Sequence, residues 1–327
     1  MFVSHPPTQV FLNDASAVRQ NLHSSTSQVP FPIPYQGSKR KLAGVIIGAF
    51  PADVENLYEP FCGSAAVALA ALARGAVQSV SLNDSNGPLI ALWKEILERP
   101  SNLASNYRRL WLEQTGREQD FYNEIRDRFN QVHDPELLLY LLARCVKAAV
   151  RYNSSGEFNQ SPDNRRRGSH PDRMENHLQR ASALLQDRCD LTAGNYEQAI
   201  QRAGPTDLVY MDPPYQGVST NRDRRYRDVL AFDEFVDVLQ ALNQRHVSFI
   251  VSYDGQTGSK VHGKPLPTSL MLDHIEIDCG RSTQATLLGH DHRTVESLYL
   301  SPALVERLER EGHYRDIDGP LPTLFSA

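Results

Sequence analysis

The chain has 327 residues, of which 40% are hydrophobic, and a formal net charge of −5. This length and composition predict a globular protein with a substantial core, and the acidic balance excludes a generally polycationic nucleic-acid-binding protein. The four cysteines lie far apart, without the spacing of a disulfide framework or a zinc site. No apolar stretch approaches the roughly 20 residues of a membrane span, and the start lacks a signal-peptide pattern. We therefore expect a soluble, cytoplasmic protein that holds no metal and contacts no membrane.

The first half of the chain begins with a polar segment and continues with alternating strands and helices. Residues 1–30 are rich in Ser, Thr, Gln, Asn and Pro without hydrophobic periodicity, which predicts a flexible N-terminal tail. Apolar runs and helical periodicity then predict a strand at 54–59, a helix at 65–73, a strand at 79–82 and a helix at 89–97. This alternation is typical of an α/β protein with a doubly wound parallel sheet.

The pattern becomes mainly helical between residues 100 and 186. It includes a helix predicted over 134–150, and an irregular polar stretch at 151–172 interrupts it. Strands and helices alternate again in the last part of the chain, with expected strands at 190–192, 207–211, 247–252, 275–279 and 296–300, the last two as a hairpin, and an expected helix at 232–244.

The simplest architecture is one Rossmann-like sheet with a helical insertion after its second strand. The predicted division is a tail at 1–30, a first catalytic part at 31–99, the insertion at 100–186 and a second catalytic part at 187–327.

The apolar run at 207–211 ends in Asp212-Pro213-Pro214-Tyr215. Ligands of open α/β sheets bind outside the carboxyl ends of the strands, where Asp212 would lie. Each proline fixes its own φ and lacks an N–H, so the turn is stiff and offers the Asp212 carboxylate and the Pro213 carbonyl as acceptors. Such acceptors suit an exocyclic amine, and Tyr215 offers a face for stacking a flat base. The alternative is an ordinary strand-ending turn.

Two segments before this motif suggest a ligand site. A glycine turn around Gly63 joins the first strand to the first helix, and Asp84 closes the second strand, where an acidic side chain can bind ribose hydroxyls. Upstream, residues 34–41 combine Tyr35, a glycine and the basic cluster that begins at Lys39, which suits a lid over a cofactor. Taken singly, these segments also fit a solvated strand end and a basic surface helix.

Together these residues resemble the Dam-type (alpha-class) adenine-specific DNA methyltransferases over roughly residues 31–300. The resemblance implies transfer of a methyl group from S-adenosylmethionine to the 6-amino group of adenine in duplex DNA, by base flipping and direct displacement. It is carried by the ordered set Tyr35-Gln36-Gly37-Ser38-Lys39, Glu59-Pro60-Phe61-Cys62-Gly63, Asn83-Asp84, Arg151-Tyr152-Asn153, Gly156-Glu157-Phe158-Asn159 and Asp212-Pro213-Pro214-Tyr215.

The same resemblance implies roles for individual residues. The implied catalytic residues are Asp212, Pro213, Pro214 and Tyr215. The implied cofactor-binding residues are Tyr35, Gly37, Lys39, Glu59, Phe61, Gly63, Asp84, Asn195, Tyr196 and Asp212. The implied DNA-binding residues are Arg151, Tyr152, Asn153, Asn159, Arg165, Arg166, Arg167 and Arg225.

The chain departs from the family pattern at two positions and leaves some alternatives open. Asn195 stands where the family often has Asp, and Ala65 stands where many relatives have a second glycine. Methylation of the 4-amino group of cytosine could use the same geometry, and an RNA substrate or a non-catalytic DNA-binding regulator are further alternatives. The expected partner is double-stranded DNA, with a restriction endonuclease that acts separately.

Three further segments lie in the last third of the chain. The basic stretch at 222–227 could close over a flipped base or be an exposed loop. The Gly-rich residues 253–267 lack the Lys-Ser/Thr of a phosphate-binding loop and are expected to be a loop beside the sheet. His290 and His292 lack further metal ligands nearby, so no metal site is expected there.

Overall fold

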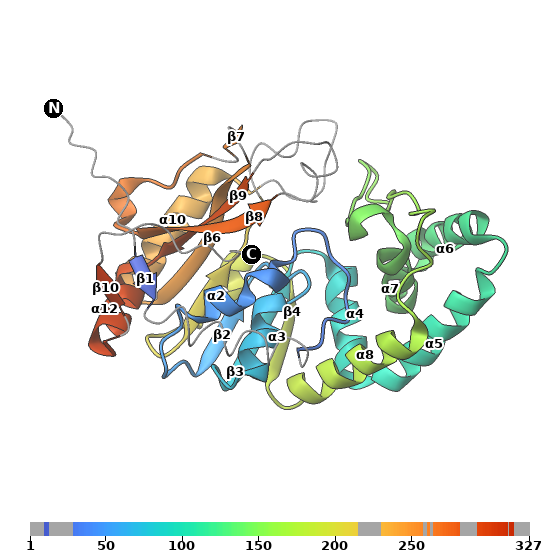
Figure 1. Ribbon diagram of the computed structural model, residues 1–327, viewed down its shortest axis with the longest axis horizontal. Coiled ribbons are helices and arrows are strands. Elements are labelled where there is room, and N and C mark those ends of the chain that lie inside the picture. The colour runs from blue at the N-terminus through green and yellow to red at the C-terminus, as the bar shows by residue number, and fades with distance from the viewer. Residues whose placement is uncertain are drawn as a thin grey trace.

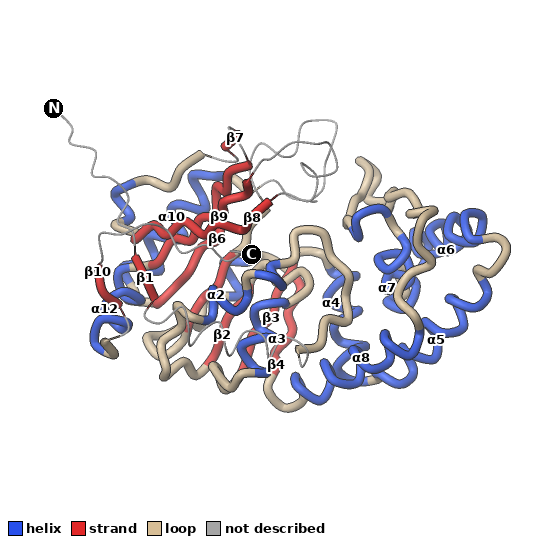
Figure 2. Tube along the Cα trace, in the orientation of Figure 1, coloured by secondary structure: helices blue, strands red, loops and turns tan. Residues whose placement is uncertain are grey.

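The computed structural model joins a mixed sheet covered by helices to a group of helices on one side (Figures 1 and 2). Most of the predicted tail, residues 1–9 and 13–28, lies outside the described residues. The short strand β1 (Val10–Leu12) pairs antiparallel with β10 (Tyr314–Asp316), close to the C-terminal end. The structure describes residues 10–12, 29–214, 230–257, 260–261, 264–281, 293–312 and 314–316.

The main sheet has a parallel part and an antiparallel edge. Among the described residues its strand order is β4-β3-β2-β5-β6-β9-β8, and β7 pairs with β6. Neighbours from β4 to β6 are parallel, whereas β9 runs antiparallel to β6 and β8. The strands are β2 (Asn56–Glu59), β3 (Ser79–Asp84), β4 (Cys189–Ala193), β5 (Leu208–Met211), β6 (Ser248–Thr257), β7 (Lys260–Val261), β8 (Asp273–Arg281) and β9 (Arg293–Leu300).

The order reverses between β2 and β5. The chain first builds outward from β2 through β3 to β4, and it then returns to place β5 on the other side of β2. In sheets of this kind the crevice at such a reversal is where ligands bind. The predicted doubly wound α/β sheet is therefore confirmed, and the chemistry-bearing ends of β2 and β5 lie next to each other.

Strand β5 is apolar because both of its faces are covered. Leu208 and Tyr210 belong to the core that also contains α2 (Ala43–Ile47), α3 (Ala66–Ala73) and α12 (Pro302–Arg310). Val209 and Met211 belong to a second core beneath α10 (Phe232–Gln244). Since successive side chains of a strand point to opposite faces, an unbroken apolar run is what a strand with two covered faces requires.

The chain between β3 and β4 is mainly helical. Proline occupies the first turn of four of these five helices, where its missing N–H costs nothing. A short hairpin at residues 151–160 lies between the last two of them. These helices are α4 (Gly87–Glu98), α5 (Pro100–Glu113), α6 (Glu118–Val132), α7 (Pro135–Arg144) and α8 (Pro171–Leu185).

The helix predicted over 134–150 is wrong in its second half. Helix α7 ends at Arg144, and Cys145 is extended with ψ 160°. The following turn, η2 (Val146–Ala148), contains two non-glycine residues with left-handed φ, 60° at Lys147 and 51° at Ala148. The backbone N–H of Val146 donates to Ser161 rather than continuing the helix, so pairing with a distant segment overrides the local helical pattern.

Two further differences concern the C-terminal part. Strand β6 continues to Thr257 through an irregularity between Tyr253 and Gln256, so the start of the expected Gly-rich loop is strand, because β9 and β7 supply pairing partners. Helix α12 was not predicted. The hairpin of β8 and β9, the predicted strands and the helix at 232–244 are confirmed.

Ser301 ties the start of α12 to the middle of the sheet. Its buried hydroxyl accepts hydrogen bonds from the backbone N–H of Phe249 at 2.9 Å and of Leu304 at 3.3 Å, the latter as an N-cap. We expect Ser301→Ala to lower the free energy of unfolding by about 1–3 kcal/mol, since it leaves buried donors without a partner. Chemical denaturation measures the change. The control is Ser105→Ala, which removes an exposed bond to Ser101 and should change the value little; equal effects would contradict the assignment.

Candidate active site

A cavity of about 620 Å³ opens at the carboxyl ends of the parallel strands, at the reversal between β2 and β5. Three acidic side chains reach it from three strand ends: Glu59 from β2, Asp84 from β3 and Asp212 directly after β5. Tyr35 and Lys39 line it from the segment that precedes α2. The fold therefore brings residues 35–39, 59–63, 84 and 212–214 into one site.

Asp212 is paired with Lys39 across 173 positions of sequence. The Lys39 Nζ lies 2.8 Å from Oδ1 and 2.7 Å from Oδ2, and its side chain is only 9% exposed. Burial raises the pKa of Asp212, and the neighbouring Lys39 ammonium opposes that rise. The structure thus places Lys39 on the predicted catalytic carboxylate. Its expected role as a cofactor ligand stays a prediction.

Glu59 is a buried carboxyl at the floor of the pocket. It accepts a 3.3 Å hydrogen bond from the backbone N–H of Ala68, and no ion pair to it occurs among the described residues. Burial raises its pKa to about 8, and the charge of Asp212 adds to the rise. Glu59 is therefore largely protonated at neutral pH until a cation comes near.

The glycine turn brings the backbone close to the pocket. Gly63 has φ 46°, and a Cβ on it would lie 3.0 Å from Cε1 of Tyr35, so a side chain there would displace that ring. The N–H of Gly63 donates to Asp84 at 3.1 Å, and Asp84 also accepts from Asn86 at 2.9 Å. Ala65 sits in the left-handed region with φ 48°, a conformation that a glycine would adopt without strain.

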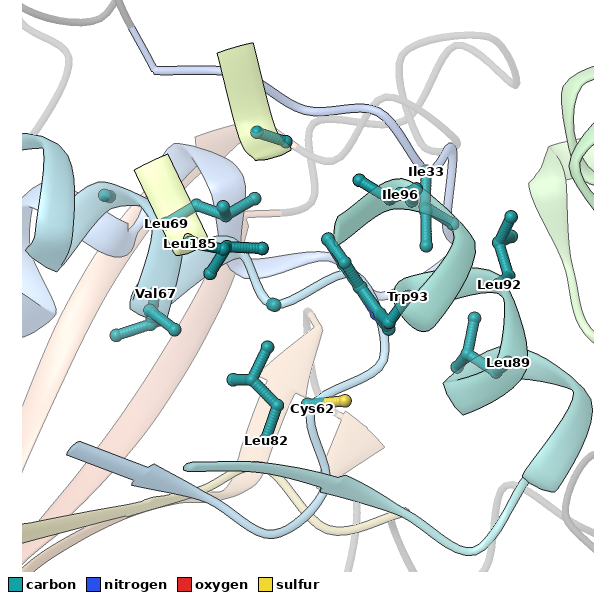
Figure 3. Packing of buried hydrophobic residues seen from close by; sticks show 14 of the residues in the cluster. Ile33, Cys62, Val67, Leu69, Leu82, Leu89, Leu92, Trp93, Ile96 and Leu185 are labelled. Atoms are coloured by element: carbon teal, nitrogen blue, oxygen red, sulfur yellow. The ribbon is translucent and has the colours of Figure 1, made fainter. Parts of the chain in front are cut away.

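Core residues hold this turn from below. The indole Nε1 of Trp93 donates to the carbonyl of Gly63 at 3.0 Å, and Figure 3 shows Trp93 packed near Cys62 and Leu82. The buried Asn83 amide donates to the carbonyls of Pro60 and Gly194, at 3.0 and 3.1 Å. One amide thus fixes the loops after β2 and β4, which makes the pocket rim rigid.

Aromatic rings form the wall near α9 (Tyr196–Ala199). Phe61 and Tyr196 stack with centroids 5.0 Å apart, and both line the pocket. The neighbouring Asn195 caps α9, because its Oδ1 accepts from the N–H of Glu197 at 2.6 Å. Asn195 is an expected cofactor-binding residue, and its amide oxygen is used by this cap, although an amide oxygen can accept a second bond.

The predicted DNA-contacting segment is a hairpin next to the pocket. Tyr152 and Phe158 form an antiparallel bridge, and the Asn153 side chain accepts from Ser155 and Glu157, so it shapes the tip. The Tyr152 hydroxyl donates to Asn86 at 3.2 Å, at the start of α4. The hairpin is therefore fastened to the same residue that bonds Asp84.

The three predicted arginines after the hairpin have different surroundings. The Arg166 guanidinium pairs with Asp163 at 2.7 Å, and Arg167 lies over the Trp111 ring at 5.0 Å. Arg165 is exposed, and its backbone N–H donates to the Asp163 carboxylate at 3.0 Å. Asn159, also exposed, donates through its backbone N–H to Arg151 at 3.0 Å.

Several predictions fall on residues outside the description. Tyr215, Arg225 and the rest of the basic stretch at 222–227 belong to the undescribed segment 215–229, and His290 and His292 are also undescribed. Within the described ranges, no group of three or more His, Cys, Asp or Glu side chains could hold a metal ion. None of the described helices is both long and apolar enough to cross a membrane.

Sequence reasoning assigned no role to some residues of the site. Gln36 donates its N–H to the carbonyl of Ala148 at 2.9 Å, which joins residues 34–41 to the turn η2, and Val150 lines the pocket just after that turn. Glu234, in the first turn of α10, also lines the pocket. A continuous helical pattern concealed the turn, and nothing in the sequence distinguished Glu234 from other acids at helix starts.

A glycine turn, strand-end carboxylates and an Asp-Pro-Pro rim, all at the reversal of a mixed sheet, define the class of Rossmann-like methyltransferases. Comparison with known families makes this specific. The profile of the D12 class N6 adenine-specific DNA methyltransferases matches residues 35–301, and the chain belongs to this family.

Individual relatives agree with this membership. The chain is 26% identical over 207 residues to the DNA adenine methylase of Escherichia coli strain K12, covering 61% of this chain and 71% of that protein. It is 27% identical over 245 residues to the retron Ec67 DNA adenine methylase of Escherichia coli, covering 73% and 78%. The chain is 29% identical over 169 residues to the DNA N-6-adenine-methyltransferase of Escherichia phage P1. The matched region spans 50% of this chain and 21% of the phage protein.

The raised pKa of Glu59 predicts a pH dependence of stability. Its folded-state pKa of about 8 lies above the ordinary value of 4.5, so the folded state binds the proton more tightly than the unfolded state. The contribution of Glu59 to stability is present below pH 4.5 and is lost as the pH rises to about 8. We expect the ligand-free protein to lose stability across this window, and Glu59→Gln, which cannot ionise, to lose less.

Urea denaturation at pH 5, 6, 7 and 8 measures the two slopes. The other buried carboxyls affect the wild type and Glu59→Gln alike. The difference between the two slopes of stability against pH therefore reports the titration of Glu59 alone. Parallel slopes would show that Glu59 titrates normally.

Proposed function

We propose that this protein transfers a methyl group from S-adenosylmethionine to the 6-amino group of adenine in duplex DNA, by base flipping and direct displacement. The observation that carries the proposal is the position of Asp212 and Pro213 after β5, at the rim of the cavity that Glu59, Asp84 and the glycine turn form. Family membership supports the same reaction.

The pocket suits S-adenosylmethionine in its charge and shape. Glu59 is a buried carboxyl without an ion pair among the described residues, so an amino-acid ammonium would satisfy it. Asp84 stands at the end of β3, where a carboxylate can accept from ribose hydroxyls. The rings of Phe61 and Tyr196 suit an adenine face, and the bare backbone at Gly63 allows close approach.

The reaction needs acceptors for the protons of the attacking amine. When bound, S-adenosylmethionine supplies an electrophilic sulfonium methyl. The Asp212 carboxylate and the Pro213 carbonyl would accept from the two N–H groups of the adenine amine and stabilise the positive charge that grows on its nitrogen. The stiff proline pair holds these acceptors in place, and Tyr215 would stack on the base. Holding amine and methyl in line supplies a large part of the acceleration.

Lys39 forms an ion pair with the carboxylate that has to accept the adenine amine. Its ammonium contacts both oxygens of Asp212, so an incoming amine has to displace the ammonium from one oxygen or share that oxygen. The same ammonium favours the ionised carboxylate, which is the form that accepts hydrogen bonds. Lys39 would therefore keep Asp212 ready at neutral pH.

The helical segment 100–186 is the proposed target-recognition region. It carries the hairpin with Arg151, Tyr152 and Asn153, which is fastened beside the pocket through Asn86. Its arginines would supply the local positive charge that an acidic protein needs for contact with phosphates. The remainder, residues 31–99 and 187–327, would form the catalytic domain.

The name of one relative bears on the biological setting. One relative, 26% identical over 191 residues, is the type II methyltransferase M1.LlaDCHI of Lactococcus lactis. By that likeness we propose a role in restriction-modification, in the cytoplasm, beside an endonuclease that acts separately.

Removing the Asp212 carboxylate tests the proposed chemistry and the base. We expect Asp212→Ala to reduce methyl transfer to DNA at least a thousandfold, because the amine loses its charged acceptor, while S-adenosylmethionine still binds in calorimetry. Digestion of DNA modified by the wild type, followed by mass spectrometry of nucleosides, should show 6-methyladenine. Finding 4-methylcytosine would favour the cytosine alternative, and full activity of the variant would refute the role of Asp212. The exposed Asp190, changed to Asn, is the control.

Replacing Lys39 tests how the ion pair sets the pH range of the reaction. Without the ammonium the pKa of Asp212 should rise, since burial is no longer opposed. We therefore expect the acid limb of the pH dependence of kcat to move to higher pH in Lys39→Gln, with loss of activity greatest below neutrality. Single-turnover rates between pH 5.5 and 9 measure the shift. An unchanged acid limb would mean that Lys39 does not control the ionisation of Asp212.

A further inference from the structure

Residues 163–169 form a surface loop, the arginine loop, that carries Arg165, Arg166 and Arg167 between the hairpin at residues 151–160 and α8. Arginines on a surface loop ordinarily sample many directions, which weakens any fixed contact with a phosphate or base. The loop in this protein rests instead on a set of buried polar side chains from α5 and α7.

Three fully buried side chains reach backbone carbonyls of the arginine loop. Nη1 of Arg144 donates to Asp163 at 3.1 Å. Nε2 of Gln114 donates to Arg167 at 3.1 Å, and the Tyr107 hydroxyl donates to Ser169 at 2.8 Å. The arginine loop is thus held at Asp163, its first residue, at Arg167, and at Ser169, its last residue before α8. We call Tyr107, Gln114, Tyr140 and Arg144 the buried network, since the Tyr140 hydroxyl also donates to Oε1 of Gln114 at 3.1 Å.

The shape of the loop is equally constrained. Gly168 has φ 86°, and a Cβ there would lie 3.0 Å from the Tyr107 hydroxyl and 3.4 Å from Cδ of Arg144. The backbone N–H of Asp163 donates to the carbonyl of Arg144 at 2.7 Å. Arg144 therefore binds Asp163 twice, through its own backbone carbonyl and through its guanidinium. A side chain at position 168 would therefore displace its neighbours, and the loop packs closely against these helices.

Burying the charged side chain of Arg144 costs free energy. It is 1% exposed, it makes no ion pair among the described residues, and its Nε has no hydrogen-bond partner there. An apolar residue of similar size would avoid the cost of burying a charge. The guanidinium instead makes a directed hydrogen bond to the carbonyl of Asp163. The Asp163 carboxylate in turn accepts from the backbone N–H of Arg165 and pairs with Arg166.

The held loop leaves one arginine uncommitted. Asp163 binds the Arg166 guanidinium, while Arg167 bonds Thr115 at 2.6 Å and lies over Trp111. The exposed Arg165 guanidinium has no ion pair or hydrogen bond to another described residue. All three arginines are exposed, and Arg165 is the one whose guanidinium is not engaged by another described residue.

We propose that the buried network fixes the arginine loop so that Arg165 binds a DNA phosphate, which makes Tyr107, Gln114 and Arg144 positioning residues for DNA contact. The inference rests on the proposed function for its ligand, a DNA duplex, but not on the transfer chemistry. Preorganisation spares the loop the ordering cost that a flexible one would meet on binding. Arg166 and Arg167 shape the loop through contacts within the protein.

The test is a double-mutant cycle on DNA affinity. Tyr107→Phe removes only the hydroxyl that holds Ser169, and Arg165→Gln removes the proposed contact. Binding of a labelled unmethylated duplex is measured by fluorescence anisotropy at several salt concentrations. Arg165→Gln should weaken binding about tenfold and lower the slope of log K against log salt by about 1. Tyr107→Phe should weaken binding severalfold, and the double variant should equal Arg165→Gln alone.

The matched control is Ser182→Ala, which removes another buried bond in the same helical region, from the Ser182 hydroxyl to the carbonyl of Leu97 at 2.8 Å. It should lower thermal stability about as much as Tyr107→Phe and leave DNA affinity unchanged. Additive effects of Tyr107→Phe and Arg165→Gln, no effect of Tyr107→Phe, or an equal loss of affinity in Ser182→Ala would each overturn the proposal. Tritiated-methyl transfer by the wild type is assayed separately, so a protein that binds DNA through Arg165 without methylating it would refute only the proposed function.

Discussion

The pairing of β2 with β5 is the constraint on which the site depends. Leu57 lies opposite Leu208 and Tyr58 opposite Val209, so two segments about 150 positions apart end at the same edge of the sheet. Glu59 follows Tyr58 directly, Asp212 comes three positions after Val209, and both reach one cavity. The helical insertion between β3 and β4 leaves this pairing intact, so the sheet can carry a large insertion without disturbing the site.

The pocket is strongly acidic. Glu59, Asp84 and Asp212 converge from three strand ends, and burial raises the pKa of each carboxyl. Two backbone N–H groups oppose the rise at Asp84, and the Lys39 ammonium opposes it at Asp212. Glu59 has only backbone donors to oppose the rise. A cavity with such an excess of acid suits a cationic ligand, and S-adenosylmethionine carries both an ammonium and a sulfonium.

DNA binding poses the opposite problem, because the chain has a net charge of −5. Its positive charge has to act locally, and the structure distinguishes arginines that a sequence run makes look equivalent. Arg166 and Arg167 are engaged within the protein, Arg144 is buried beneath them, and Arg165 faces solvent. The number of arginines in a run is therefore a poor measure of the charge offered to a phosphate.

The sequence by itself determined the α/β class, most strands and the short motifs of the pocket. Periodicity, glycine and proline chemistry act over a few residues, so Gly63, Asp84 and the Asp212-Pro213-Pro214 turn could be identified locally. Only tertiary structure decided that Lys39 binds Asp212, that α7 stops at Arg144, and that Gln114 and Tyr107 hold the arginine loop. Each of these depends on a partner far away in the chain, and a local pattern carries no information about such partners.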